Sequence, residues 1–227
     1  MKVISFEGID GTGKSVQMAE LEKRLVATGK RVKTLSFPMY DRFFGGYVGE
    51  YLTGKDDIRA DDVDGKSMAL WFALDRWEAF CRLKASGELE NTDFLLINRY
   101  VLSNAVYQSI RERDLDKPDI TQFVFDLEYE HFKLPRPDFQ LILDVAPADA
   151  AENVIKKGYR DYVGEDRDLY EALPSIQERA RRRYIELAKS SRGAVLVSCM
   201  KQHALLPIDA ITADIWDIVK NACIDGV

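Results

Sequence analysis

A glycine-rich stretch near the start of the chain constrains the fold more than any other feature. Residues 2–15 read KVISFEGIDGTGKS, and the apolar residues before Gly8 have the composition of a buried parallel strand. Gly8, Gly13, Lys14 and Ser15 fit the pattern G-x-x-x-x-G-K-[ST], in which successive backbone N–H groups turn inward around phosphate oxygens. The stretch therefore predicts a nucleotide-binding loop.

Each residue of this loop has an expected task. Contacts with the nucleotide phosphates are predicted for Gly8, Gly11, Thr12, Gly13, Lys14, Ser15 and Val16. Lys14 would reach the outer phosphates, and the Ser15 hydroxyl would ligate a Mg²⁺ ion. Residues 16–28 then show the periodicity of an amphipathic helix, which ends at Gly29. A strand before the loop and a helix after it are the context that this motif requires.

Length, charge and cysteine content narrow the class of protein. The chain has 227 residues and no break in composition, which predicts a single domain over residues 1–227. Its net charge of −6 disfavours a nucleic-acid partner. Cys81, Cys199 and Cys223 lack the spacing of a metal site and are expected to be core thiols in a reducing compartment. With no secretion signal and no bilayer-length apolar run, a cytoplasmic protein without a membrane partner is expected.

Apolar runs and amphipathic periodicities alternate along the chain. Strands are predicted over residues 3–6, 30–37, 94–97, 139–145 and 195–198. Helices are predicted over residues 16–28, 47–52, 67–85, 102–113, 120–133, 147–157 and 208–222. This alternation predicts the α/β fold of P-loop NTPases, which is a doubly wound, mostly parallel five-stranded sheet with helices on both faces.

Two polar stretches separate these elements. The acidic residues between Asp56 and Asp64 are expected to form a solvated connection, because they lack the glycine and the final glutamate of a calcium loop. Residues 156–171 carry mixed charge and no apolar periodicity. They could be an exposed loop, but in a phosphoryl-transfer enzyme they have the composition of a lid that brings arginines over the phosphates.

Aromatic and arginine side chains gather where the strands are predicted to end. This set comprises Phe37, Tyr40, Phe72, Arg76, Arg99 and Tyr107. Rings offer stacking area and guanidinium groups grip phosphate or carbonyl oxygens, so the set suits a flat base that carries a phosphate. Core packing is an equal alternative for Phe72 and Trp77, whereas Arg76 should be a surface residue or a ligand-binding one. The N-K-x-D segment of GTPases is absent from the sequence.

These residues lie in motifs that resemble a known family. The segments FEGIDGTGKS, SFPMYD, ALDRWE, NRYVLSNAVYQ and DLYE occur in the order seen in thymidylate kinases, and the likeness covers residues 2–189. The resemblance implies Mg²⁺-dependent transfer of the γ-phosphate of ATP to dTMP, giving dTDP and ADP. It also implies a homodimer.

The resemblance assigns the acceptor to one group of residues. They are Asp10, Phe37, Pro38, Tyr40, Phe72, Arg76, Arg99, Ser103, Asn104, Tyr107, Gln108 and Tyr170. Phe72 would stack on thymine, Arg76 would read a base carbonyl, and Asn104 would face the base edge. Tyr107 would lie beneath the sugar. Arg99 would hold the dTMP phosphate together with Tyr40, and Asp10 would lie near the sugar and phosphate.

Catalytic and metal-binding roles follow from the same resemblance. The implied catalytic residues are Lys14, Arg99, Arg160 and Arg167, and the implied metal ligands are Ser15, Asp10, Asn98 and Glu171. Some members carry a basic residue inside the phosphate loop, where this chain has Gly11 and Thr12, so the lid would supply the arginine, with Arg160 favoured over Arg167. Asn98 stands where the family usually has aspartate, and it keeps an acceptor oxygen while it loses the charge.

Three alternatives remain open at this point. The nearest is a kinase of the same fold that acts on another acceptor, such as dUMP, a modified deoxynucleotide or a deoxynucleoside. A P-loop ATPase that uses hydrolysis as a switch is the alternative from a different class. Asn98 alone suggests the third, a catalytically weakened nucleotide-binding protein.

Overall fold

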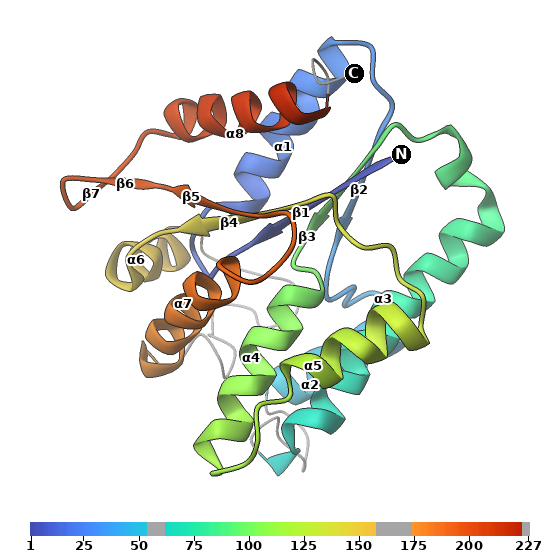
Figure 1. Cartoon of the computed structure of the whole chain (residues 1–227), viewed down its shortest axis with the longest axis vertical. Helices are drawn as coiled ribbons and strands as arrows, with labels where there is room; N and C mark the ends of the chain where they lie inside the picture. Colours follow the sequence, from blue (N-terminus) through green and yellow to red (C-terminus); the bar gives the residue numbers. More distant parts are fainter. Residues whose placement is uncertain (54–61, 158–173, 224–227) are drawn as a thin grey trace.

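A five-stranded parallel sheet forms the centre of the molecule (Figure 1). The computed structural model describes residues 1–53, 62–157 and 174–223. The strands of the sheet are β1 (Lys2–Glu7), β2 (Val32–Ser36), β3 (Phe94–Asn98), β4 (Phe139–Asp144) and β5 (Ala194–Ser198). Their order is β2-β3-β1-β4-β5, and every neighbouring pair is parallel. The predicted fold class is confirmed.

The register of the strands brings three loops to one edge of the sheet. Phe6 of β1 and Ser36 of β2 both pair with Asn98 at the end of β3. The chain therefore leaves all three strands at the same level, which is the edge where open α/β sheets bind ligands. The end of β3, followed by Arg99, therefore lies between the loop after β1 and the residues that follow β2.

Helices cover both faces of the sheet (Figure 1). They are α1 (Lys14–Ala27), α2 (Phe43–Thr53), α3 (Gly65–Ser86), α4 (Val101–Asp114), α5 (Thr121–Phe125), α6 (Pro147–Lys157), α7 (Pro174–Ala188) and α8 (Ile208–Cys223). A 3₁₀ turn, η2 (Glu88–Asn91), and a π-helix, η3 (Asp126–His131), complete the helical segments of the described residues. Helices α1 and α8 pack together on one face, and α4 lies on the other with α3, α5 and α7 around it.

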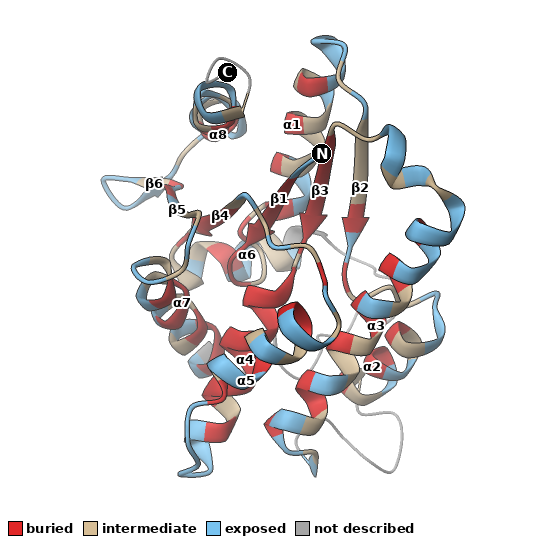
Figure 2. Cartoon of the chain, turned by 45° about the vertical axis from the view of Figure 1, so that its right-hand side comes forward, coloured by how far each residue is buried: buried red, intermediate tan, exposed pale blue. Residues whose placement is uncertain are grey.

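Alternating side chains of the inner strands fill two layers of core. Ile4 and Phe6 of β1 pack on the side of Leu21 and Leu25 from α1, whereas Val3 belongs to the opposite layer. Helix α4 is enclosed so completely that every residue from 101 to 110 is buried, as its colour in Figure 2 shows. Polar side chains on α4 are therefore held in fixed, dehydrated positions.

Helix α3 exposes several apolar side chains and one cysteine. Leu70 and Trp77 are 38% and 39% exposed, and Cys81 is exposed as well, so the prediction that all three cysteines are core thiols is wrong for Cys81. The buried face carries Ala73 and Phe80 instead. Because apolar and charged residues are distributed around α3 without a distinct apolar stripe, its periodicity could not identify the inner face.

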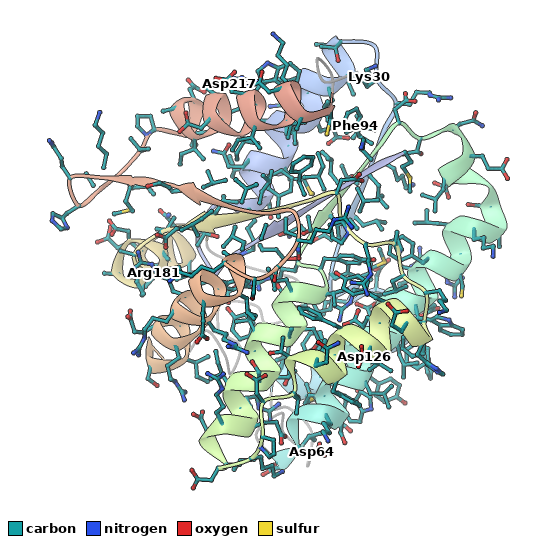
Figure 3. All side chains as sticks on the ribbon, in the orientation of Figure 1. Lys30, Asp64, Phe94, Asp126, Arg181 and Asp217 are labelled. Atoms are coloured by element: carbon teal, nitrogen blue, oxygen red, sulfur yellow. The ribbon has the colours of Figure 1, made fainter. Side chains whose placement is uncertain are left out.

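The first turn of α3 corrects another expectation. Asp64 caps this helix by accepting hydrogen bonds from the N–H groups of Lys66 (3.0 Å) and Ser67 (3.1 Å), so it does more than solvate a connection. Figure 3 labels Asp64 at this helix end. The rest of the acidic stretch up to residue 61 lies outside the described residues.

Several further elements depart from the sequence prediction. Helix α7 and the hairpin of β6 (Met200–Lys201) with β7 (Ala204–Leu205) were not predicted. Helix α2 is longer than the predicted segment. The helix predicted over residues 120–133 is α-helical only to Phe125 and continues as the π-helix η3, where Glu128 and Tyr129 are both buried. Most of the predicted lid lies outside the described residues.

Candidate active site

The loop after β1 folds around the ammonium group of Lys14. The Lys14 Nζ donates to the carbonyl oxygens of Gly8 (3.0 Å) and Ile9 (2.7 Å), and the residue is only 6% exposed. Helix α1 begins at Lys14, so its amino-terminal N–H groups face the space in front of the loop. This arrangement supplies both a fixed cation and backbone donors for phosphate oxygens.

Two glycines are required by close backbone approach. Gly11 has φ +80°, and a Cβ added there would lie 1.9 Å from the carbonyl oxygen of Ala150 in α6. Gly8 has φ +130°, and its added Cβ would lie 2.8 Å from the carbonyl oxygen of Leu143. Any other residue at either position would displace the loop from the sheet or from α6.

The loop lines a first cavity. Its walls are Asp10, Gly11, Thr12, Gly13, Lys14, Ser15, Val16, Gln17, Asn98, Arg99, Asn153, Val154, Leu205, Leu206, Ile208 and Ile211. All predicted phosphate-loop residues except Gly8 are included. The sequence analysis missed the apolar end, where Leu205 lies in β7 of the unpredicted hairpin and Leu206 follows it. Asn153 was also missed, although its Nδ2 holds the loop by donating to the Gly11 carbonyl oxygen (3.0 Å).

A second cavity lies next to the first. Its walls are Asp10, Phe37, Pro38, Tyr40, Leu52, Phe72, Arg76, Arg99, Ser103, Asn104, Tyr107 and Gln108. Every acceptor residue expected from the sequence is present except Tyr170, which lies outside the described residues. Leu52 is the only wall residue that the sequence analysis did not name.

Asp10 and Arg99 belong to both cavities. Arg99 has a left-handed backbone (φ +61°), which turns it back over the loop, and its Nη2 is bonded to Asp10 Oδ1. Burial alone would raise the pKa of Asp10, but the charges of Arg99 and Lys14 outweigh burial and lower the pKa. Asp10 is therefore an anion at neutral pH, held between two cations where the cavities meet.

Gln177 fixes the other side of Asp10. Its Oε1 accepts from the Asp10 backbone N–H (3.2 Å), and its Nε2 donates to Asp10 Oδ2 (3.3 Å). The Tyr107 hydroxyl also reaches Asp10 Oδ2 (3.4 Å). Gln177 lies on α7, so missing that helix also meant missing this residue. Ile176, Ala180 and Tyr184 at helical spacing were the available signal.

A buried glutamate holds the strand end that carries Arg99. Glu7 Oε1 accepts from the Tyr100 N–H (3.1 Å), and Oε2 accepts from Ser103 Oγ (2.6 Å), which also contacts the Tyr184 hydroxyl (2.8 Å). Burial raises the pKa of Glu7. Three separate elements, β1, α4 and α7, thus fix the left-handed turn at Arg99. The sequence analysis gave Glu7 no role.

The far end of the second cavity contains a buried ion pair. Arg76 is 2% exposed and bonds Glu128 through Nε to Oε2 (2.5 Å) and through Nη2 to Oε1 (2.7 Å). The expectation that Arg76 would not be buried is wrong, because η3 supplies a countercharge that the sequence did not reveal. The guanidinium also lies 5.9 Å from the Phe37 ring centroid.

Asn98 lies next to Ser15 at the phosphate loop and has a side-chain oxygen that could ligate a metal ion. Its Nδ2 donates to Ser36 Oγ (2.9 Å) and lies 3.5 Å from Ser15 Oγ. Its Oδ1 is buried and accepts no hydrogen bond from any described residue. The oxygen donors of Ser15, Asn98 and Asp10 match the preference of Mg²⁺. No group of three His, Cys, Asp or Glu side chains suited to a metal ion occurs among the described residues.

The predicted lid residues cannot be placed. Arg160, Arg167, Tyr170 and Glu171 all lie outside the described residues. Their roles stay predictions from the sequence.

Two cavities that meet at a cation-rich boundary, one of them walled by a phosphate-binding loop, define a nucleoside monophosphate kinase of the P-loop class. The family model described as thymidylate kinase matches residues 6–206. The chain belongs to the thymidylate kinase family.

Named relatives agree with this assignment. The thymidylate kinase of Mycobacterium tuberculosis is 33% identical over 192 residues, which cover 84% of this chain and 87% of that protein. The human thymidylate kinase is 32% identical over 224 residues, covering 97% and 90% respectively. The solved structure of thymidylate kinase from Candida albicans superposes with a TM-score of 0.69 at 23% identity, covering 97% of this chain and 92% of that one, which supports the fold. Within the described ranges, no helix combines the length and apolar character needed to cross a membrane.

Proposed function

We propose that this chain transfers the γ-phosphate of ATP to dTMP and releases dTDP and ADP. One observation carries the proposal: the phosphate-loop cavity and the aromatic cavity share Asp10 and Arg99. An ATP molecule in the first and a monophosphate in the second would bring their phosphates together at this boundary. Holding two reactants in line and stabilising the developing charge are the main contributions that a protein makes to phosphoryl transfer.

The donor would bind with its phosphates against the loop from Gly8 to Ser15. Lys14 would exchange its bonds with loop carbonyls for phosphate oxygens and offset the charge that moves during transfer. The apolar end of the cavity, with Val154, Leu205 and Ile208, is suited to cover the adenine base.

The acceptor would bind with its base at the Phe72 and Arg76 end and its phosphate at Arg99. Phe72 offers a stacking surface, and Tyr107 lies where the sugar would pass, next to Asp10. The bond to Asp10 positions the Arg99 guanidinium before the phosphate binds. Ser103 and Gln108 complete the wall along α4.

We further propose that Mg²⁺ accompanies ATP, held by Ser15, with Asn98 and Asp10 near it. The ion would supply positive charge that offsets the negative charge developing on the phosphates during transfer. The unpaired Oδ1 of Asn98 supports this assignment, because among the described residues it has no donor to satisfy it. Glu171 and the arginines Arg160 and Arg167 are proposed to join the site from the lid.

A homodimer is proposed as well. Leu70 and Trp77 are seven residues apart on the same face of α3 and are both more than one-third exposed. A second copy covering this face would remove that apolar surface from water. Light scattering coupled to gel filtration measures the mass: about twice the 25.9 kDa of the chain supports the dimer, and the mass of one chain rejects it.

A coupled ADP-release assay over a panel of nucleoside monophosphates and deoxynucleosides tests the main proposal. ADP released only when dTMP is present supports it. ADP release that needs a different acceptor indicates a kinase of another specificity. ADP release without any acceptor indicates an ATPase, and none under any condition indicates a nucleotide-binding protein.

A further inference from the structure

Glu128 occupies an unusual position below the base end of the second cavity. It lies in the π-helix η3, directly after α5, and is fully buried. Short π-helical segments often occur at functional sites. The carboxylate touches two walls of the cavity at once, because it contacts Arg76 on α3 and Asn104 on α4.

The contacts of Glu128 determine which way the Asn104 amide is turned. Asn104 Nδ2 donates to Glu128 Oε1 (2.8 Å) and to the Ala69 carbonyl oxygen (3.0 Å). Both partners only accept hydrogen bonds when Glu128 is ionised, so the NH₂ group must face them. The amide oxygen is consequently turned away from Glu128, and this buried Oδ1 accepts no hydrogen bond from any described residue.

The same carboxylate fixes the orientation of Arg76. Its bonds to Glu128 use Nε and Nη2, so neither of them uses Nη1. Arg76 and Asn104 both line the cavity. Glu128 therefore leaves an arginine donor, Arg76 Nη1, and an amide acceptor, Asn104 Oδ1, outside its own bonds on two residues that line the cavity.

This pair is complementary to one kind of base edge. Thymine and uracil offer a carbonyl oxygen at position 4 next to an N–H at position 3, which match a donor and an acceptor. Cytosine offers the reverse, with an amino group next to a bare ring nitrogen. With cytosine, the Arg76 donor would face the donating amino group, and the Asn104 oxygen would face the accepting ring nitrogen. Polar groups that are buried without a hydrogen bond cost binding free energy.

We propose that Glu128 is a specificity-determining positioning residue, which selects thymine over cytosine by holding the Asn104 amide oxygen and Arg76 toward the base. The inference rests on the proposed function, because it requires a pyrimidine monophosphate in the second cavity. Glu128 acts through Asn104 and Arg76 and does not touch the base itself.

The test compares kcat/KM for dTMP and dCMP in Glu128→Gln and in a control. A glutamine can present its own NH₂ group to Asn104, which allows the amide to turn over and show its NH₂ to the base. The ratio of kcat/KM for dTMP over dCMP should then fall at least about tenfold, while the KM for ATP stays unchanged. Glu130→Gln is the control, since Glu130 lies on the same π-helix but is 59% exposed and paired with Arg136, and its ratio should equal that of the unchanged protein.

A double-mutant cycle separates positioning from general damage. In Asn104→Leu the amide is absent, so adding Glu128→Gln should alter the dTMP over dCMP ratio much less than it does alone. An equal fall of the ratio in both backgrounds, or no fall in Glu128→Gln, overturns the inference. If Glu128→Gln does not fold, Glu128→Asp keeps the charge but shortens the reach to Asn104, and a ratio unchanged in that variant also overturns it. If the unchanged protein does not phosphorylate dTMP, the proposed function fails instead.

Discussion

Replacing Asp75 by asparagine should change how the stability of the protein depends on pH. Asp75 is 1% exposed, and its Oδ2 accepts from the Met39 N–H (3.0 Å), which ties α3 to the loop that carries Pro38 and Tyr40. Its Oδ1 has no hydrogen-bond partner among the described residues. Burial, only partly opposed by the Met39 bond and by Arg76, raises the pKa of Asp75 from 3.8 to about 6.

The size of the change in the free energy of unfolding follows from the difference between the pKa of Asp75 in the folded and in the unfolded state. Because the folded state holds the proton more tightly, it binds more protons than the unfolded state between pH 4 and pH 6. Stability from this group is therefore present at low pH and is lost as the pH rises through about 6. Between pH 4.5 and pH 8 the loss amounts to about 2 kcal/mol.

Urea unfolding of the unchanged protein and of Asp75→Asn at both pH values measures this loss. The free energy of unfolding of the variant, relative to the unchanged protein, should rise by about 2 kcal/mol between pH 4.5 and pH 8. An unsatisfied amide in the variant adds a cost that is the same at both pH values and cancels in this comparison. Asp217→Asn removes the same charge from an exposed side chain of α8 and serves as the control. Equal pH dependence in Asp75→Asn and the unchanged protein would refute the reasoning.

Three further predictions concern the nucleotide site. Asn98→Asp should lower the Mg²⁺ concentration that gives half-maximal rate, because it restores a charged ligand beside Ser15; no change would show that the position does not handle metal. Gly11→Ala should raise the KM for ATP about tenfold or more, since the left-handed backbone costs about 1–2 kcal/mol and the added Cβ meets Ala150. An unchanged KM for ATP would contradict the conclusion that residue 11 must be glycine for the loop to pack against α6. Arg160→Ala should lower kcat about a hundredfold, and unchanged turnover would count against a lid arginine in transfer.

The sequence alone predicted those parts of the fold and site that depend on a local pattern of residues. The phosphate loop, the five strands and the residues that line the second cavity, apart from Leu52, were predicted, because buried parallel strands, strand ends and the motifs of the family leave strong signals. Motif residues such as Phe72 and Asn104 could be placed by family resemblance alone. Their contacts could not.

What the sequence did not reveal depends on partners that are distant along the chain. Arg76 was not expected to be buried, because its countercharge Glu128 lies 52 residues away in a helix of unusual pitch. The buried face of α3 could not be chosen, because apolar and charged residues are mixed around this helix. Gln177 and Glu7 act through hydrogen bonds to residues far from them in sequence, and a single sequence gives no signal for such pairs.

The most direct measurement is a crystal structure of the protein with ADP and dTMP bound together. The account predicts ADP phosphates around Lys14, the thymine ring against Phe72 and Arg76, and the dTMP phosphate beside Arg99, facing the donor across the boundary of the two cavities. Thymine bound anywhere else, or a dTMP phosphate turned away from Arg99, would contradict it.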